Sequence, residues 1–241
     1  MSKSKKNVVD PEDIINEYGA DTARLFMLSD SPPERDINWS LAGINGAWKF
    51  TQKFWRVVRS CEEIFLVDLK KQPEIFDQKS IQFRKKIHGY LKSITLSIEN
   101  FQINVAVAKI HELTGEISNF KSESIGESWC KKEALVILLR VVEPIMPHLA
   151  EECWHMIGKT ESIMDTQWPK FEESLLTENE SLIIIQINGK KRAELKMSIE
   201  STENEVFESA ILLKNVKSFI QKKEDIKKKI YIKNKILNLV I

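Results

Sequence analysis

A mainly helical protein is predicted, in which an antiparallel helix bundle precedes a small α+β module with the element order ββαββ. Two observations predict this fold. Between residues 41 and 169, apolar residues recur at helical spacing. From Leu182 onward, short β-branched runs alternate with turn signals. The 241 residues are enough for one large domain or two small ones.

The composition is typical of a soluble globular protein, with 42% hydrophobic and 29% charged residues. No apolar run reaches the roughly 18–20 residues that a bilayer span needs, so no membrane is expected as a partner. The basic N-terminus is followed by no apolar stretch and does not resemble a secretory signal. Cys61, Cys130 and Cys153 form no Cys-x-x-Cys pair, which favours a reducing, cytoplasmic location and neither a disulfide framework nor a zinc knuckle.

Charge is distributed unevenly along the chain. Residues 182–241 contain 13 Lys and Arg against 7 Asp and Glu, a net charge of +6. The whole chain carries +1, so residues 1–181 carry −5. The acidic part is therefore unlike a generic nucleic-acid binder, whereas the basic tail is suited to contact phosphate.

The first region, residues 1–40, predicts two short helices. Asp10 is placed to cap the first helix, and Pro11 suits its first position. Gly19 is expected to end it. The second helix is predicted over residues 22–28, and Ser31-Pro32-Pro33 stops it because proline lacks a backbone donor.

The second region opens with two long helices. The first is predicted from apolar residues near helical spacing, namely Ala47, Trp48, Phe54, Trp55, Val58 and Cys61. Ser80 is expected to cap the next helix. The inner face of that helix is predicted to carry Ile87, Leu91, Ile94 and Ile98.

Three more helices complete the predicted bundle. The third covers Val105 to Phe120, and the fourth contains the apolar run 134–139, which indicates a central position. Pro144 and Pro147 break it. A last helix is predicted from His148 to Met156, so that four or five antiparallel helices assemble.

The third region changes to strand patterns. Residues 182–187 are β-branched and too short for a helix, and Asn188-Gly189 is a strong hairpin signal. A return strand is predicted over residues 192–199. Helical spacing follows over residues 203–220, and residues 229–241 are predicted to form a second hairpin.

The N-terminal run Met1-Ser2-Lys3-Ser4-Lys5 has the chemistry of a phosphate-gripping loop. A lysine in a short serine-rich loop before a capped helix offers an ammonium, hydroxyls and backbone N–H groups to phosphate oxygens. The alternative is a solvated basic terminus, which is the usual meaning of such a run in isolation.

Longer motifs decide between these two interpretations. The runs Met1–Ile15, Tyr18–Leu28 and Ser31–Asp36, followed by Trp39-Ser40, together resemble the KMSKS region of class I aminoacyl-tRNA synthetases, and in detail that of bacterial leucyl-tRNA synthetases. Phe101–Ala106 and Glu143–Trp154 are similar to segments of that family's anticodon-binding bundle, and Gln186–Arg192 to a hairpin of its C-terminal domain.

The resemblance implies site residues. Lys3 corresponds to the second lysine of KMSKS and is expected to act in catalysis, with Met1, Ser2, Lys3 and Ser4 binding ATP. Contacts to tRNA are expected from Lys190, Arg192, Lys227, Lys228 and Lys229. ATP with Mg would be bound by the complete enzyme, and the partners would be tRNA-Leu, leucine and a catalytic half located upstream or on a separate subunit.

The predicted organisation follows the same resemblance. Residues 1–40 would be the KMSKS loop and connecting helices, 41–170 a bundle of the class I anticodon-binding type, 171–181 an acidic linker and 182–241 a tRNA-contacting domain. The expected function is the C-terminal part of a leucine–tRNA ligase, inactive alone. The alternatives are a stand-alone, non-catalytic tRNA- or RNA-binding module and the smaller subunit of a split synthetase.

Two other patterns have competing interpretations. His148, Glu152 and His155 share one helix face near Cys153 and could imitate a metal site. A packing turn is favoured, so no metal site is predicted. The six tryptophans could stack on bases, but their helical spacing favours core positions.

Overall fold

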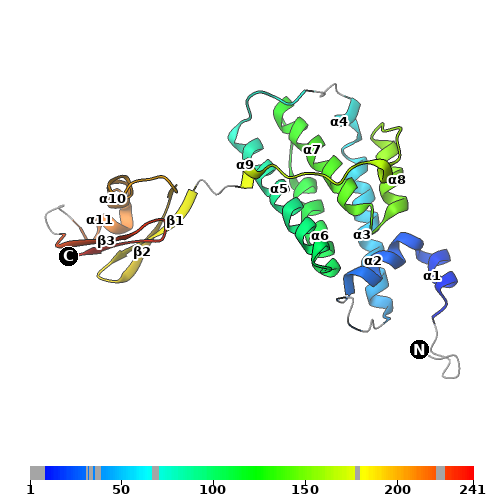
Figure 1. Cartoon of the computed structure of the whole chain (residues 1–241), viewed down its shortest axis with the longest axis horizontal. Helices are drawn as coiled ribbons and strands as arrows, with labels where there is room; N and C mark the ends of the chain where they lie inside the picture. Colours follow the sequence, from blue (N-terminus) through cyan, green and yellow to red (C-terminus); the bar gives the residue numbers. More distant parts are fainter. Residues whose placement is uncertain are drawn as a thin grey trace. The chain divides into compact units, whose positions relative to one another are not determined.

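The computed structural model describes residues 9–30, 32, 35, 39–66, 71–176, 180–220 and 226–241. The chain divides into two compact units, Met1–Leu176 and Thr177–Ile241 (Figure 1). The first unit is helical, and the second contains a four-stranded sheet with short helices. The predicted mainly helical fold with a small C-terminal α+β module is confirmed.

Helices α1 (Pro11–Tyr18) and α2 (Ala20–Asp30) begin and end as local chemistry requires. Asp10 caps α1, because its Oδ1 accepts a hydrogen bond from the Glu12 N–H at 3.0 Å. Pro11 occupies the first turn, where a missing N–H costs nothing. Gly19 has φ 84°, a left-handed value that favours glycine, and ends α1 as predicted.

The rest of the first unit is a helix bundle with three short additional helices. Figure 1 shows α5, α6 and α7 lying side by side. The elements are α3 (Leu41–Arg59), α4 (Glu62–Leu66), α5 (Gln78–Glu99), α6 (Ile103–Asn119), α7 (Ile125–Val142), α8 (Pro147–Met156), η2 (Ile163–Asp165) and α9 (Glu173–Leu176). Within the described part of the chain, no helix is both long and apolar enough to cross a bilayer.

The predicted cap of α5 was wrong by three residues. Asp77 is the N-cap, with extended backbone angles, and its carboxylate accepts a hydrogen bond from the Ser80 N–H at 2.7 Å. Ser80 therefore lies inside the first turn. An N-cap needs a non-helical backbone as well as a side-chain acceptor, and only Asp77 has both.

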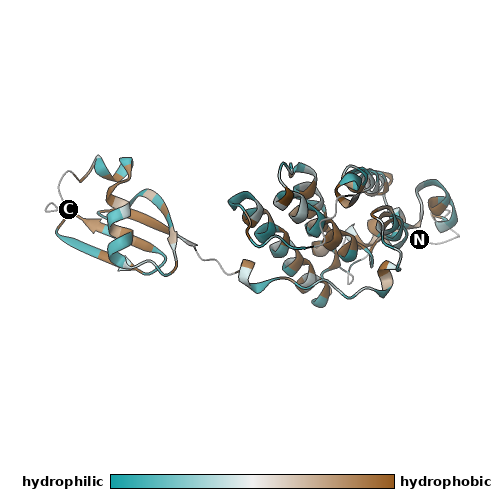
Figure 2. Cartoon of the chain, turned by 90° about the horizontal axis from the view of Figure 1, so that it is seen from above, coloured by the Kyte–Doolittle hydropathy of each residue, from teal (hydrophilic) through white to brown (hydrophobic). Residues whose placement is uncertain are grey.

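The bundle buries one continuous hydrophobic core. Figure 2 shows hydrophobic residues gathered toward the neighbouring helices and hydrophilic residues facing outward. Ile87, Leu91 and Ile94 on α5 are buried as predicted, and Trp154 on α8 is wholly buried. The Trp154 indole still satisfies its N–H by donating to the Glu161 carbonyl at 3.0 Å.

An extended segment after α8 crosses the bundle to α9 (Figure 1). Trp168 Nε1 donates to Thr95 Oγ1 on α5 at 2.9 Å. The Glu172 N–H donates to His88 Nδ1 at 3.0 Å. These bonds hold the segment against α5 at two points.

A long-range contact joins α2 to the corner between α7 and α8. Arg24 donates to the carbonyls of Ile145 at 3.1 Å and Pro144 at 2.7 Å. The Asp21 carboxylate accepts from the Leu149 N–H at 2.6 Å and from His148 Nδ1 at 2.8 Å. Asp21 thus provides the acceptor at the start of α8 that the side chain of its N-cap residue does not provide.

The second unit contains the sheet, in the order β2-β1-β4-β3. Its strands are β1 (Glu180–Ile187), β2 (Lys190–Ser198), β3 (Lys228–Ile232) and β4 (Ile236–Val240). Both predicted hairpins form antiparallel pairs, and β1 pairs with β4 in parallel. Asn188 and Gly189 have φ 49° and 77°, as a two-residue hairpin turn with two positive φ values requires.

The single helix predicted over residues 203–220 is two helices, α10 (Glu203–Ile211) and α11 (Lys214–Lys217). Leu213 between them has φ −67° and ψ 132°, an extended conformation. In one continuous helix, Ala210 and Val216 would point roughly 120° apart. The break allows both side chains to be fully buried in the core of this unit.

Removing the Asp21 carboxylate tests the contact between α2 and α8. The Asp21→Ala change leaves the Leu149 N–H without its acceptor, so the free energy of unfolding should fall by about 1–2 kcal/mol. Urea unfolding followed by helical circular dichroism measures this fall. Asp13→Ala is the control, because Asp13 is exposed, and it should change stability by less than about 0.5 kcal/mol. Equal urea midpoints for Asp21→Ala and the wild-type chain would contradict the assignment.

Candidate functional site

The predicted phosphate loop, Met1, Ser2, Lys3 and Ser4, lies outside the described residues. Its roles therefore stay predictions. Val9, just before α1, is the first described residue.

An apolar pocket of about 410 Å³ lies on α1 and α2. Ile15 and Met27 in its lining are 47% and 54% exposed. The lining residues are Val9, Pro11, Ile14, Ile15, Ala20, Ala23, Arg24, Phe26, Met27 and Trp39. This surface has the composition of a protein contact.

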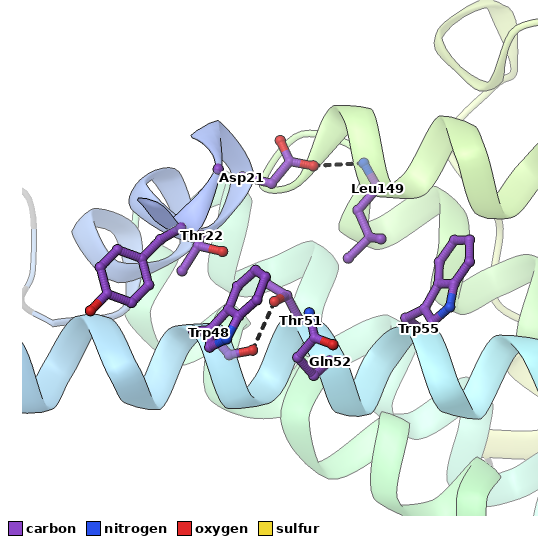
Figure 3. A pocket seen from close by; sticks show the side chains of 9 residues that line it. Asp21, Thr22, Trp48, Thr51, Gln52, Trp55 and Leu149 are labelled. Atoms are coloured by element: carbon purple, nitrogen blue, oxygen red, sulfur yellow. Dashed lines mark hydrogen bonds between the residues drawn. The ribbon is translucent and has the colours of Figure 1, made fainter. Parts of the chain in front are cut away.

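A second pocket, of about 360 Å³, lies between α2, α3 and α8 (Figure 3). Trp48 and Trp55 stand on α3, and Figure 3 shows Thr51 and Gln52 between them. Tyr18 meets Trp48 edge-on, with ring centroids 6.3 Å apart and planes at 80°. Three of the lining residues are aromatic, namely Tyr18, Trp48 and Trp55.

The polar groups of this pocket differ in availability. Both Asp21 oxygens are used by His148 and Leu149, and Thr51 donates to the Trp48 carbonyl at 2.8 Å. Among the residues that the structure describes, the Gln52 amide has no hydrogen-bond partner. None of the described lining residues is Lys or Arg. The pocket therefore suits a neutral, flat group better than an anion.

The pocket was not predicted from the sequence. The tryptophans were assigned to the core, and Trp154 is indeed wholly buried. Four others are partly buried and pack against the core, namely Trp39, Trp55, Trp129 and Trp168. Trp48 is 38% exposed. The signal that could have found it is the spacing of Trp48, Gln52 and Trp55, which places them on one helix face.

The structure places the predicted tRNA contacts of the first hairpin on the edge strand β2. Lys190 directly follows the hairpin turn and is exposed. Arg192 is half-buried, with its guanidinium 4.0 Å from the Phe219 ring centroid and a buried Nε without a hydrogen-bond partner. Arg192 therefore presents only part of its charged group to solvent.

Lys227, Lys228 and Lys229 lie on or beside the opposite edge strand, β3, and all three are exposed. The Lys229 ammonium lies 3.3 Å from the Phe207 ring centroid, on the helix-covered side of the sheet. Strand pairing places Lys228 on the other side. Three strand spacings separate the two edges, roughly 14 Å, so the structure does not bring the two groups of basic residues together.

A possible metal-binding group in the described chain is His88, Glu133 and Glu172. The guanidinium of Arg84 already binds both carboxylates of this group. Arg84 donates to both Glu133 oxygens at 2.8 and 2.9 Å and to Glu172 at 2.5 Å. The guanidinium supplies the positive charge that these carboxylates need, which favours a structural ion-pair network over a metal site.

The other candidate metal ligands are used in packing contacts. His148 bonds Asp21, while His155 Nδ1 lies 2.9 Å from the Lys159 carbonyl, and its Nε2 lies 3.1 Å from Glu151. Cys153 is fully buried, and burial raises the pKa of its thiol to about 12. These residues do not converge on one point.

Comparison with protein families assigns the chain to a family. The family model "Anticodon-binding domain of tRNA ligase" matches residues 82–208, and the model "tRNA synthetases class I (I, L, M and V)" matches residues 1–40. The first match spans more than half of the chain. The chain belongs to the family of tRNA ligases with an anticodon-binding domain.

Curated relatives identify the kind of ligase. The chain is 43% identical over 241 residues to a leucine–tRNA ligase of Parvibaculum lavamentivorans and 39% identical over 244 residues to one of Rhodopseudomonas palustris. Each match covers the whole chain but only 28% of the relative's length. The chain corresponds to the C-terminal part of leucine–tRNA ligase.

Solved structures support the fold. A leucyl-tRNA synthetase of Agrobacterium radiobacter K84, in a ternary complex with tRNA and LeuAMS, superposes with a TM-score of 0.78 and 24% identity, over 100% of this chain and 31% of that one. A methionyl-tRNA synthetase of Mycobacterium tuberculosis gives 0.54 and 17% identity over 69% of this chain and 41% of that one.

The buried network predicts an acid-sensitive stability. Burial alone would raise the pKa of Glu133, but hydrogen bonds from His88 and Arg84 outweigh it and hold this pKa below its ordinary value. The ionised carboxylate therefore stabilises the fold above the unfolded-state pKa, and this contribution is lost as pH falls through the folded pKa.

Urea unfolding between about pH 5 and pH 3 measures this contribution. The wild-type chain should lose stability over this window, and the loss should be shallower in Glu133→Gln, which has no proton to bind at this position. Glu173→Gln is the control, because Glu173 is largely exposed. An unchanged pH slope in Glu133→Gln would show that this carboxylate does not lower its pKa on folding.

Proposed function

We propose that this chain acts as the C-terminal part of an ATP-dependent leucine–tRNA ligase. In this proposal it supplies the KMSKS loop and surfaces that bind tRNA-Leu. The observation that carries it is the whole-length match to leucine–tRNA ligases. That match favours this function over a stand-alone RNA-binding module.

The proposed chemistry of the loop is electrostatic. Adenylate formation builds negative charge on the α-phosphate and on the departing pyrophosphate of ATP. The Lys3 ammonium, helped by the hydroxyls of Ser2 and Ser4, would stabilise that charge. ATP would be used together with Mg²⁺, and no described residue of this chain is assigned to the ion.

The apolar surface on α1 and α2 has a role in the same proposal. Residues 1–40 match the model of the class I tRNA synthetases. In this proposal the catalytic part of the ligase lies outside this chain. We assign the exposed Ile15 and Met27 to the contact with that catalytic part. Burying the exposed half of each of these two side chains would contribute roughly 1 kcal/mol per side chain.

The proposed tRNA contacts of the second unit divide by their surroundings. Lys190, Lys227 and Lys228 have exposed ammonium groups and are assigned direct phosphate contacts. The charged groups of Arg192 and Lys229 lie over the Phe219 and Phe207 rings. These contacts orient the two side chains and leave their positive charge intact. A cytoplasmic location, where tRNA is aminoacylated, completes the proposal.

Salt titration tests the tRNA contacts. The chain alone should bind tRNA-Leu more weakly as salt rises, with a linear log–log dependence. The double change Lys227→Gln and Lys228→Gln should flatten that slope by about 1.8, since each phosphate contact contributes about 0.9. Lys86→Gln is the control because Lys86 pairs with Glu116 in the helical unit. An unchanged slope in the double variant would remove these lysines from the interface.

Leucine-dependent exchange of pyrophosphate into ATP tests the loop. In the complete ligase, removing the charge of Lys3 with Lys3→Ala should slow exchange by about 100-fold or more, as loss of one transition-state contact does. Lys121→Ala, in the same protein, should leave the rate unchanged. The 241-residue chain alone should show no exchange. A wild-type exchange rate in the Lys3 variant would exclude the proposed phosphate contact.

A further inference from the structure

The exposed face of α3 concentrates positive charge in an otherwise acidic part of the chain. Its 19 residues include Lys49, Lys53, Arg56 and Arg59 and no acidic residue. Residues 1–181 as a whole carry −5. A helix with four cations and no compensating acid is unusual for a solvated face, where charges of both signs normally alternate.

These four cations are exposed. Among the residues that the structure describes, none of their side chains forms an ion pair or a hydrogen bond. In contrast, Lys79, Lys86 and Lys109 elsewhere in the unit all pair with glutamates. The α3 cations therefore keep their full attraction for an external anion.

The positive stripe runs beside the aromatic pocket. Trp48, Gln52 and Trp55 follow one line along α3, and the three cations Lys49, Lys53 and Arg56 each lie one residue further, roughly 100° around the helix. Each of these three α3 residues thus has a cation at the next position of the helix.

This arrangement selects the chemistry of a ligand. The pocket contains aromatic rings and a free amide but no cation, and the carboxylate of Asp21 would repel a phosphate there. The cations lie outside it. A flat, uncharged ring with hydrogen-bonding edges fits inside, and its attached phosphates fit outside, as in a nucleotide.

We propose that the exposed face of α3 holds one unpaired nucleobase of a bound RNA, with Trp48 stacking on the base and Lys49, Lys53 and Arg56 contacting its flanking phosphates. The proposal rests on the tRNA-binding function proposed above and names a site for it. The Gln52 amide, one turn from Trp48, donates to or accepts from the edge of the base.

Trp48 is the stacking residue rather than Trp55. The two side chains start two turns apart, roughly 10 Å along the helix axis, which is too far for one base to lie between both rings. Trp48 is 38% exposed, whereas Trp55 is half-buried and forms a wall. The edge-on contact with Tyr18 fixes the orientation of the Trp48 ring.

The test compares variants that separate stacking from packing. Fluorescence anisotropy would measure binding of the 241-residue chain to tRNA-Leu. Trp48→Leu keeps an apolar side chain but removes the ring, and it should weaken binding by about 5- to 150-fold, the value of one base–aromatic stack. Trp48→Phe keeps a ring and should stay close to the wild-type affinity. Trp129→Phe is the matched control away from the pocket.

Charge variants test the phosphate contacts independently. The double change Lys49→Gln and Lys53→Gln should flatten the log–log salt slope by about 1.4, because each single-strand phosphate contact contributes about 0.7. The double change Lys85→Gln and Lys121→Gln removes the same charge elsewhere in the helical unit and should leave the slope unchanged. Circular dichroism confirms that each variant is folded.

Binding of AMP to the chain distinguishes a site for a base within RNA from a site for a free nucleotide. If AMP binds far more weakly than tRNA-Leu, the site takes a base within RNA. If AMP binds tightly and Trp48→Leu abolishes its binding while tRNA affinity is unchanged, the site holds a free nucleotide, and the RNA assignment is overturned.

Two further results would be decisive. Wild-type affinity and salt slope in both the Trp48→Leu and the Lys49→Gln, Lys53→Gln variants would overturn the nucleobase site, and would leave this face for a protein contact. Failure of the wild-type chain to bind tRNA-Leu at any salt concentration would instead overturn the function on which the site rests.

Discussion

The helical unit depends on the contact between α2 and the corner joining α7 to α8. Helix ends leave unsatisfied carbonyls at one terminus and N–H groups at the other. Here Arg24 donates to the Pro144 and Ile145 carbonyls in the corner that follows α7, and Asp21 accepts from the Leu149 N–H at the start of α8. The negative charge of Asp21 also has the sign that the dipole of α8 favours at its N-terminus. Two residues one turn apart therefore fix α2 against both helices.

The same contact determines the chemistry of the pocket beside α3. Asp21 lines this pocket, but its two oxygens are already bonded, so its carboxylate contributes negative charge without a free acceptor. A second constraint sets the spacing of α2 and α3, because a Cβ at Gly43 would collide with the Phe26 ring. Packing requirements therefore produce an aromatic pocket that disfavours anions next to a helix that attracts them.

The sequence predicted the features that depend on local chemistry. Asp10 and Gly19 delimit α1, and Asn188-Gly189 forms the hairpin turn, because each acts on its own backbone. The N-cap of α5 is Asp77 rather than Ser80, because Asp77 has the extended backbone angles of a cap. Both side chains can accept a hydrogen bond, so residue type alone does not show which of the two is the cap. The break at Leu213 involves neither proline nor glycine, and it follows from burial of residues on both sides against the sheet.

The candidate sites show why charge alone does not locate an interface. The basic residues of the second unit are visible in the sequence, but the parallel pairing of β1 with β4 puts them on opposite edges. In the first unit the net charge of −3 hid the stripe on α3. A local stripe of cations attracts a phosphate backbone even where the net charge of the unit is negative. The negative net charge is therefore compatible with RNA binding at α3.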